Sequence, residues 1–321
     1  MNTDHFDGKK FFNPEIDDHL HGFTDMVKWQ FTREPGAWRG YVELPPGPPP
    51  PARVAAGELR VTFVNHSTVL LQFDGLNILT DPIWSERAGP VSWAGPKRAH
   101  SPGIRLADLP PIDAILLSHN HYDHLDLPTL RQLRDRWNPP IFTGLGNDRY
   151  LAKKGLAKVT ALDWWQRTAG PGGLAITFVP AQHFTGRSMT DHFQTLWGGF
   201  FLQSAAGGIY FAGDTGYASH FRQIRERLGA PRLALLPIGA YEPRWFMRQM
   251  HINPGEAVKA SRELGAAASL GIHFGTFRLA DDAQDQPVAD LRKAREQYGV
   301  PPERFFTLAP GEGRDVPPAA F

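Results

Sequence analysis

The chain has 321 residues, of which 41% are hydrophobic, so it is long enough to form one large domain or two small ones with a substantial core. Its net charge is near +1 and its basic residues form no long run, which argues against nucleic-acid binding. Because there is no cysteine, disulfides, thiolate metal sites and a cysteine nucleophile are excluded, and histidines and carboxylates must hold any metal.

The amino-terminal residues contain no apolar stretch of the kind found in secretory signals. No segment has the length of uninterrupted apolar residues that a membrane-spanning helix needs. We therefore expect a cytoplasmic protein without a signal peptide or a transmembrane helix, and we leave open a peripheral contact with a membrane.

Residues 1–52 differ from the rest of the chain. Their aromatic side chains follow no clear period, and the stretch ends in a proline run that cannot form a helix or an inner strand. We interpret them as an N-terminal arm with a proline-rich connector, whose aromatic residues pack on a main domain formed by residues 53–321. The alternative is a lid, or an apolar surface that meets lipid or a second subunit.

The main domain shows strand patterns first and helix patterns later. Early strands are expected at 59–64, 69–73 and 76–80, with Asp74-Gly75 as a hairpin turn. The loop after Asp81 is rich in Gly and Pro and long enough to indicate a function. Further strands are expected at 112–117, 141–143, 159–165, 174–180, 208–212 and 268–272, and helices at 127–137, 219–228, 254–264 and 287–296. This order predicts two sheets with helices outside.

A dense group of metal-binding side chains occupies the loop between the strand 112–117 and the helix that follows. Residues 118–126 read Ser-His-Asn-His-Tyr-Asp-His-Leu-Asp. His119 and His121 lie two apart on an extended segment and can point to one ion, while Asp123 and His124, on the next turn, can point to a neighbouring one. Zinc and similar cations bind imidazole nitrogen and carboxylate oxygen, so the loop predicts a metal site.

Three more potential ligands each follow a predicted strand: His183, Asp214 and His273. Any one of them alone is more often a satisfied polar residue, but together with the loop they place potential ligands at four strand ends, which favours a shared site. His66 also follows a strand and could border the site, although a single histidine in this position is more often a structural hydrogen-bonding residue.

The pattern His-Xaa-His-Xaa-Asp-His at 119–124, followed by the distant histidine, aspartate and histidine, resembles the metallo-β-lactamase superfamily. The resemblance implies an α/β fold, the αββα sandwich of two mixed β-sheets flanked by helices, with residues 53–321 as the catalytic domain. It implies two sets of ligands that share one residue: His119, His121 and His183 for the first metal, Asp123, His124 and His273 for the second, and Asp214 as the bridge. Two divalent ions are implied, with zinc expected and manganese or iron left open.

The flanking sequences carry a narrower resemblance. They include Asn-His-Ser-Thr-Val at 65–69, Leu-Thr-Asp-Pro-Ile-Trp-Ser-Glu-Arg-Ala at 79–88, Phe-Ala-Gly-Asp-Thr-Gly-Tyr at 211–217 and Pro-Ile-Gly-Ala-Tyr-Glu-Pro-Arg-Trp-Phe-Met at 237–247. These stretches are similar to the N-acyl-phosphatidylethanolamine-hydrolysing phospholipase D family. The resemblance implies a metal-dependent phosphodiesterase that hydrolyses N-acyl phosphatidylethanolamine-type phospholipids by a metal-bridging hydroxide, which is the phospholipase D reaction.

By the same resemblance the catalytic residues are Asp214, Asp123 and His251. His251 matches a histidine that lies near the metals in that family; its other interpretation is a residue in the loop before the helix that Asn253-Pro254 begins. The candidates for phosphate contacts are Lys97, Arg98 and Arg244, although each of them can also be explained as a structural residue.

Other functions remain open at this point. The same metal site could open a small lactone or cleave a soluble phosphodiester, or the protein could be a non-catalytic, envelope-associated metal-binding protein. The N-terminal arm and residues 184–195 depart from the mammalian enzyme, and these regions would bear on acyl-chain and membrane recognition. The expected partner is a phospholipid or another phosphodiester substrate, nucleic acid is not expected, and a homodimer is left open.

Overall fold

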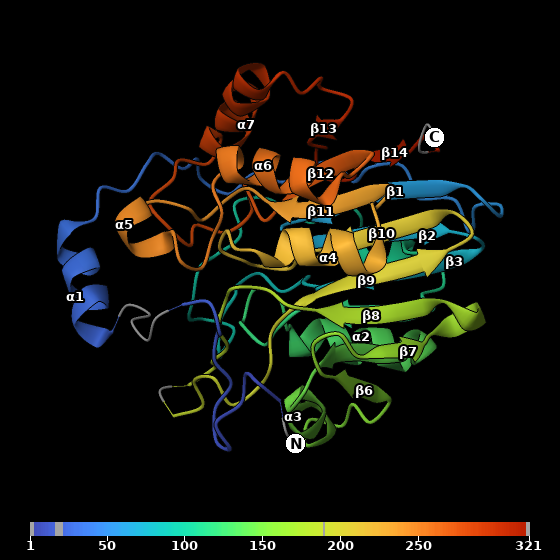
Figure 1. Ribbon diagram of the computed structural model, residues 1–321, viewed down its shortest axis with the longest axis horizontal. Helices are drawn as coiled ribbons and strands as arrows, with labels where there is room; N and C mark the ends of the chain where they lie inside the picture. The colour runs from blue at the N-terminus through green and yellow to red at the C-terminus, as the bar shows by residue number, and fades with distance from the viewer. Residues whose placement is uncertain (1–2, 17–21, 189, 319–321) are drawn as a thin grey trace.

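The computed structural model, which describes residues 3–16, 22–188 and 190–318, contains two seven-stranded sheets (Figure 1). In spatial order the first sheet consists of β14 (Gly313–Asp315), β1 (Leu59–Asn65), β2 (Thr68–Phe73), β3 (Leu76–Thr80), β4 (Ala114–Leu117), β5 (Ile141–Gly144) and β6 (Val159–Leu162). The second consists of β13 (Phe305–Phe306), β12 (Ala268–Ile272), β11 (Leu233–Pro237), β10 (Gly207–Phe211), β9 (Gly199–Ser204), β8 (Ala175–Val179) and β7 (Arg167–Ala169).

The first sheet begins as an antiparallel meander and continues as a parallel sheet. β1, β2 and β3 pair antiparallel, and β3 to β6 pair parallel. The predicted turn at Asp74-Gly75 joins β2 to β3, and its two residues have φ values of +48° and +74°. Positive φ at both central positions matches the twist of the strands, and such turns favour Asp-Gly.

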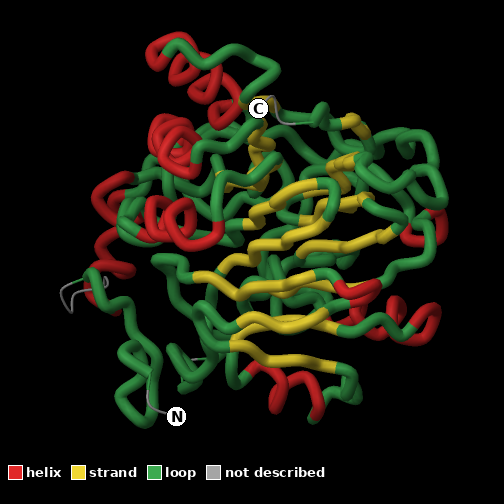
Figure 2. Tube along the Cα trace, turned by 45° about the vertical axis from the view of Figure 1, so that its right-hand side comes forward, coloured by secondary structure: helices red, strands yellow, loops and turns green. Residues whose placement is uncertain are grey.

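The second sheet is also mixed, with an antiparallel half from β7 to β10 and a parallel half from β10 to β13. The apolar side chains that the two sheets direct toward each other form the largest buried cluster, which includes Phe63, Phe178, Phe200 and Phe211. Figure 2 shows the strands of one sheet lying across the middle of the molecule, with helices at the periphery.

Helices cover the two outer faces of the sandwich. The outer face of the first sheet packs on α2 (Leu127–Trp137) and α3 (Asn147–Ala152), and that of the second on α4 (His220–Leu228), α6 (Pro254–Leu264) and α7 (Gln286–Tyr298). The start of α6 is fixed by a capping box, in which Asn253 Oδ1 accepts from the Glu256 amide at 2.8 Å and the Glu256 carboxylate accepts from the Asn253 amide at 3.0 Å. The expected αββα sandwich is therefore confirmed.

The N-terminal arm packs on the sandwich, and part of it is helical. α1 (Phe23–Thr32) was not expected, because its aromatic residues show no period; Trp29 anchors it in a buried cluster. The Trp29 ring lies 5.0 Å from that of Phe246 in α5 (Arg244–Met247), and its Nε1 donates to Asp281 Oδ2 at 2.8 Å. Within the described part of the chain, no helix combines the length and the apolar character needed to cross a bilayer.

The carboxyl ends of the site strands converge on one edge of the sandwich. In the first sheet β1, β3 and β4 run in the same direction, and in the second sheet β8, β10 and β12 do so. The predicted ligands follow these strands directly, so the fold brings them to the same edge. α1 and α5 lie at this side of the molecule in Figure 1, and the described chain ends on the opposite side.

Candidate metal centre

The loop at residues 118–126 is held by contacts from a distant segment. Arg187 Nη1 donates to the carbonyl oxygens of Asn120 and Leu125, at 2.7 and 2.9 Å, and its guanidinium lies 3.9 Å from the centre of the Tyr122 ring. Tyr122 in turn donates its hydroxyl to the Arg187 carbonyl at 2.8 Å. These bonds fix the backbone that carries the ligands, so the loop is a rigid platform.

Three histidines of the first predicted set bring one ring nitrogen each to a common point. His121 Nδ1 lies 2.8 Å from His119 Nε2 and 3.3 Å from His183 Nε2. Nitrogens bound to one tetrahedral zinc ion at about 2.0–2.1 Å lie roughly 3.3 Å apart, so this spacing suits a shared ion. Burial lowers the pKa of His119 and His183 well below the usual value and that of His121 to about 4, which keeps all three rings in the neutral, metal-binding form.

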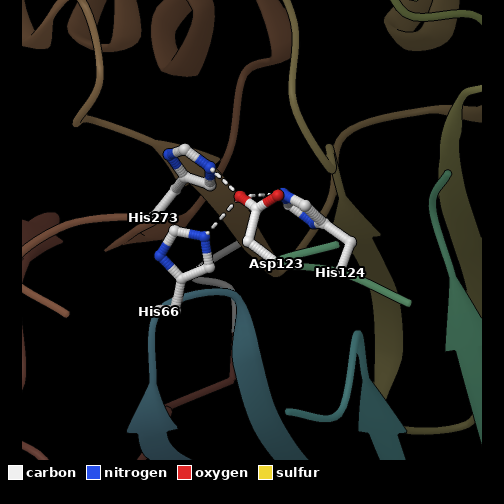
Figure 3. Close-up of side chains that lie close together, drawn as sticks. All are labelled: His66, Asp123, His124 and His273. Carbon is white, nitrogen blue, oxygen red and sulfur yellow. Dashed lines mark hydrogen bonds and ion pairs between the residues drawn. The ribbon is translucent and has the colours of Figure 1, made fainter. Parts of the chain in front are cut away.

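The second predicted set meets at the carboxylate of Asp123 (Figure 3). Asp123 Oδ2 lies 3.2 Å from His124 Nε2 and 3.3 Å from His273 Nε2. Burial opposes ionisation of Asp123, but the surrounding histidines outweigh it and lower its pKa well below the usual value. The set therefore offers one anionic oxygen and two imidazole nitrogens at the distances expected for ligands of one ion.

Asp214 lies between the two sets. Its Oδ2 is 3.2 Å from His124 Nε2, 3.0 Å from His273 Nε2 and 3.9 Å from His183 Nε2. Burial alone would raise its pKa, yet His273 and His124 hold it well below the usual value, so the group is a carboxylate. One side chain thus reaches both ligand sets, as a bridging residue must.

The unpaired atoms of the site fit two divalent ions. Among the described residues, Asp214 Oδ1 is buried without a hydrogen-bond partner, which is costly unless something else satisfies it, and His124 Nε2 makes ion pairs with the two carboxylates but no hydrogen bond. Burial would lower the pKa of His273, but Asp214 and Asp123 raise it to about 9, and carboxylates likewise raise that of His124. In the metal-free site, protons on these histidines balance the negative charge of the carboxylates, as bound cations would. The nitrogen and oxygen donors suit zinc, manganese or iron.

Comparison with known proteins agrees with this geometry. Residues 76–274 match the family described as the Beta-lactamase superfamily domain. The chain belongs to the metallo-β-lactamase superfamily. It is a metal-dependent hydrolase of this superfamily, with a binuclear-type site of histidines and aspartates.

This metallo-β-lactamase superfamily protein is similar to two sequence relatives and to one solved structure. An uncharacterized protein from Mycobacterium tuberculosis is 38% identical over 298 residues, covering 91% of this chain and 78% of the relative. N-acyl-phosphatidylethanolamine-hydrolyzing phospholipase D 1 from Caenorhabditis elegans is 41% identical over 270 residues, covering 79% and 75%. A metallo hydrolase from Ignicoccus hospitalis, 22% identical, shares the fold with a TM-score of 0.61 over 80% of this chain and 98% of its own.

A buried carboxylate that the sequence did not identify supports both ligand sets of this superfamily member. Asp81 Oδ2 accepts from His124 Nδ1 at 2.6 Å and from Ser118 Oγ at 2.5 Å, and Ser118 Oγ lies 2.9 Å from His119 Nδ1. These bonds place a proton on Nδ1 of each histidine and turn Nε2 toward the metal position. The sequence signal for Asp81 was its position directly after a strand, β3. The predicted ligands also follow strands.

His66 also belongs to the site. Its Nε2 lies 2.9 Å from Asp123 Oδ2, and burial lowers its pKa to about 3, so the ring is neutral. His66, Asp123, His124 and His273 form one group of potential metal ligands. His66 therefore makes the expected structural hydrogen bond and also borders the site, because its hydrogen-bond partner is a site residue.

His251 reaches the site from the loop after α5. Its Nδ1 lies 3.9 Å from Asp214 Oδ2, and its ring centre is 5.1 Å from that of His183. Its side chain is 13% exposed, and burial lowers its pKa to about 4. The structure therefore places His251 beside the predicted ligands, at a point that solvent still reaches.

The three candidates for phosphate contacts are engaged elsewhere. Lys97 Nζ pairs with Glu86 at 2.7 Å, and Arg98 donates to the carbonyl oxygens of Ser85 and Ile83. Arg244 donates to the His251 carbonyl at 2.9 Å and to Glu256 at 2.8 Å. These contacts account for all three side chains, and Arg244 in particular fixes the backbone of His251.

Proposed function

We propose that this protein is a phosphodiesterase that hydrolyses N-acyl phosphatidylethanolamine-type phospholipids at the bond cleaved by a phospholipase D. The observation that carries the proposal is the position of Asp214, whose Oδ2 lies 3.2 Å from His124 and 3.9 Å from His183 and so joins two sets of ligands. A two-ion centre is suited to displacement at phosphorus, where both entering and leaving oxygens need stabilisation. The likeness to the Caenorhabditis elegans phospholipase D supports the choice of substrate.

The side chains of the site have distinct tasks in this reaction. Two divalent ions held by them would make a water molecule acidic enough to attack at neutral pH and would neutralise charge on the phosphoryl oxygens. Asp214, ionised and within reach of both sets, would help to hold both ions and would orient the attacking water, while Asp123 would help to hold the second ion. Neutral His251 lies at the exposed side of the site, where its ring can hydrogen-bond to the departing oxygen.

The surface around this edge favours a lipid substrate over a soluble one. Of the large apolar side chains that are exposed in the described residues, all but Val288 belong to the arm, to the loop after β3 or to α5: Phe12, Met26, Phe31, Tyr41, Val42, Val91, Trp93 and Trp245. Lys28 lies 4.8 Å over the Trp245 ring and Lys97 lies 5.4 Å over Tyr41. Aromatic rings flanked by lysines are typical of surfaces that contact the membrane interface, and we propose a peripheral membrane contact here.

A substrate panel tests the proposal. The panel contains N-acyl phosphatidylethanolamine, phosphatidylcholine, a small lactone and a soluble bis-aryl phosphate, each assayed with and without a chelator. We expect release of N-acylethanolamine and phosphatidic acid from the first lipid and loss of this activity with the chelator. Turnover of only the lactone or the soluble diester would replace the lipid by that substrate class, and two bound ions without any turnover would support a non-catalytic role.

Two variants link the activity to the site. His121→Ala removes a nitrogen from the first set, and Asp214→Asn removes the shared anionic oxygen, so each is expected to abolish metal-dependent hydrolysis while the circular dichroism spectrum stays unchanged. Asp135→Asn, on the exposed face of α2, is the matched control. Undiminished turnover in either site variant would contradict the assignment.

A further inference from the structure

His66 connects the two sheets at the second ligand set. It is the first residue after β1, its side chain is 1% exposed, and its φ is +48°. Its backbone amide donates to Thr276 Oγ1 at 2.9 Å, and its carbonyl accepts from the His273 amide at 2.8 Å. Both partners lie in the segment after β12 of the other sheet. The end of β1 is therefore fixed to the segment that supplies the ligand His273.

The side chain of His66 is directed at another ligand of the same set. Its Nε2 lies 2.9 Å from Asp123 Oδ2, and its ring centre is 4.1 Å from that of His273 (Figure 3). The centre of the Phe277 ring lies 5.3 Å away. The edge contact with Phe277 and the packing on His273 leave the ring little freedom to turn. With its proton on Nε2, the ring donates to the carboxylate, and a donor in this position determines which way the Asp123 carboxylate points.

Other ligands are oriented by hydrogen bonds from outside the ligand sets. His124 is oriented through its Nδ1 by Asp81 at 2.6 Å, and His183 through its Nδ1 by the Met250 carbonyl at 3.0 Å. Asp123 sits on a turn, and Oδ2 faces His124 and His273, which a bound cation would engage. Among the described residues, His66 then orients this carboxylate from outside the predicted ligand set.

We propose that His66 is a positioning residue for the second metal ion, which acts by holding the Asp123 carboxylate through its side chain and His273 through its main chain. The inference rests on the two-ion site of the proposed function. A positioning residue can be distinguished from a metal ligand by substitution. Another hydrogen-bond donor of similar length can replace a positioning residue, but it cannot replace a metal ligand. Glutamine offers an amide N–H near the position of histidine Nε2 and binds metal weakly, so it separates the two roles.

The matched control is a second buried histidine–aspartate pair. His5 Nε2 lies 2.8 Å from Asp163 Oδ1, a geometry close to that of His66 and Asp123, but it joins the N-terminal arm to the segment after β6, and neither residue belongs to a predicted ligand set. His5→Leu and His66→Leu thus remove similar hydrogen bonds. Only the second of them is expected to affect metal binding.

The experiment measures zinc binding to chelator-treated full-length protein by competition with a metal indicator, with bound zinc counted by elemental analysis. We expect two equivalents in the wild type and in His5→Leu. In His66→Leu the second equivalent should bind 10- to 100-fold more weakly while the first stays unchanged, and His66→Gln should stay within a few-fold of wild type. The unchanged first equivalent reports that the variant is folded.

Three outcomes would overturn the inference. Wild-type affinity for both ions in His66→Leu would show that the residue does not position the site. A loss in His66→Gln as large as that in His66→Leu would show that His66 does not act by donating a hydrogen bond. Binding of a single equivalent by the wild type would overturn the two-ion function itself, and this inference with it, and so is distinguished from the other two results.

Discussion

The carboxylate of Asp81 accepts a 2.6 Å hydrogen bond from Nδ1 of His124, although 43 positions separate the two residues in the chain. The same carboxylate also accepts from the backbone amide of Ser118 at 2.8 Å. It therefore connects the end of β3 to both ends of the ligand-bearing loop. Loss of this carboxylate should weaken metal binding at both positions.

The substitution Asp81→Asn tests this support. Asparagine keeps one acceptor oxygen, so its NH2 group must face either the Ser118 amide or the Nδ1–H of His124 and leave that donor without an acceptor. We expect zinc affinity to fall 10- to 100-fold and the free energy of unfolding to fall by about 1–3 kcal/mol. Competition titration and urea denaturation measure the two effects. Asp113→Asn, which removes acceptors at the other end of β4, should lower stability alone; an equal loss of zinc affinity there would contradict the prediction.

The metal-free protein should be most stable near pH 6.5. Burial lowers the folded-state pKa of His66 to about 3 and those of His121 and His251 to about 4, so below pH 6.5 the unfolded chain binds protons that the folded chain does not. Stability should fall as pH decreases from 6.5 to 4, on the order of 1 kcal/mol per pH unit for each histidine. The pKa of His273, raised to about 9, contributes stability below pH 6.5 that is lost as pH rises through 9. Denaturation at several pH values in a chelator checks this, and a flat profile from pH 6.5 to 4.5 would be inconsistent with it.

The two ions should differ in the protons that they displace. The histidines of the first set are neutral, whereas carboxylates raise the pKa of His124 well above its usual value and that of His273 to about 9, so the second set is protonated at pH 7. Binding of the second ion should therefore release more protons than binding of the first and should weaken as pH falls from 9 to 6. Calorimetry in two buffers with different ionisation enthalpies counts the protons in each step. Equal release in both steps would refute the assignment.

We expect the exposed aromatic residues of the arm and of the loop after β3 to govern membrane binding. Phe31 and Trp93 are 87% and 79% exposed. Burying such side chains in an apolar phase contributes about 1.5–3 kcal/mol each, so the double variant Phe31→Ser/Trp93→Ser should bind vesicles of phosphatidylcholine and an anionic lipid at least tenfold more weakly. Hydrolysis of a soluble diester should not change. Val288→Ser, on α7, is the control, and undiminished vesicle binding by the double variant would remove this surface from consideration.

The sequence was sufficient for the parts of the fold whose signals are local. The Asp74-Gly75 turn, the helix after the metal loop and four strand ends with polar residues could be predicted from neighbouring residues. β11 was not expected: its five buried residues form a short apolar run that periodicity does not distinguish from a buried helix segment, and no potential ligand directly follows it. The helix α1 was not expected either, because its anchor Trp29 depends on Phe246 and Asp281, which are distant in the chain.

The same limit applies to the site. Each predicted ligand follows a strand and carries a side chain whose chemistry is evident, so the set could be assembled from the sequence, and the structure places all of its members together. The roles of Asp81 and His66 depend on which strand ends meet: Asp81 on the approach of β3 to the metal loop, and His66 on the meeting of β1 with the segment after β12. Such pairings arise from tertiary packing, which local pattern does not report.

The position of the last strand determines where an affinity tag or a surface tether can be joined to the protein. β14 pairs antiparallel with β1, with Gly313 opposite Thr62 and Asp315 opposite Arg60, so it leads the chain away from His66 and the metal edge (Figure 1). The arm at the other end of the chain lies against the centre, where Asn13 Nδ2 donates to the His183 carbonyl at 2.8 Å. An affinity tag or surface tether joined after residue 318 would therefore leave the metal edge free to meet a vesicle, whereas one inserted into the arm near Asn13 would crowd it.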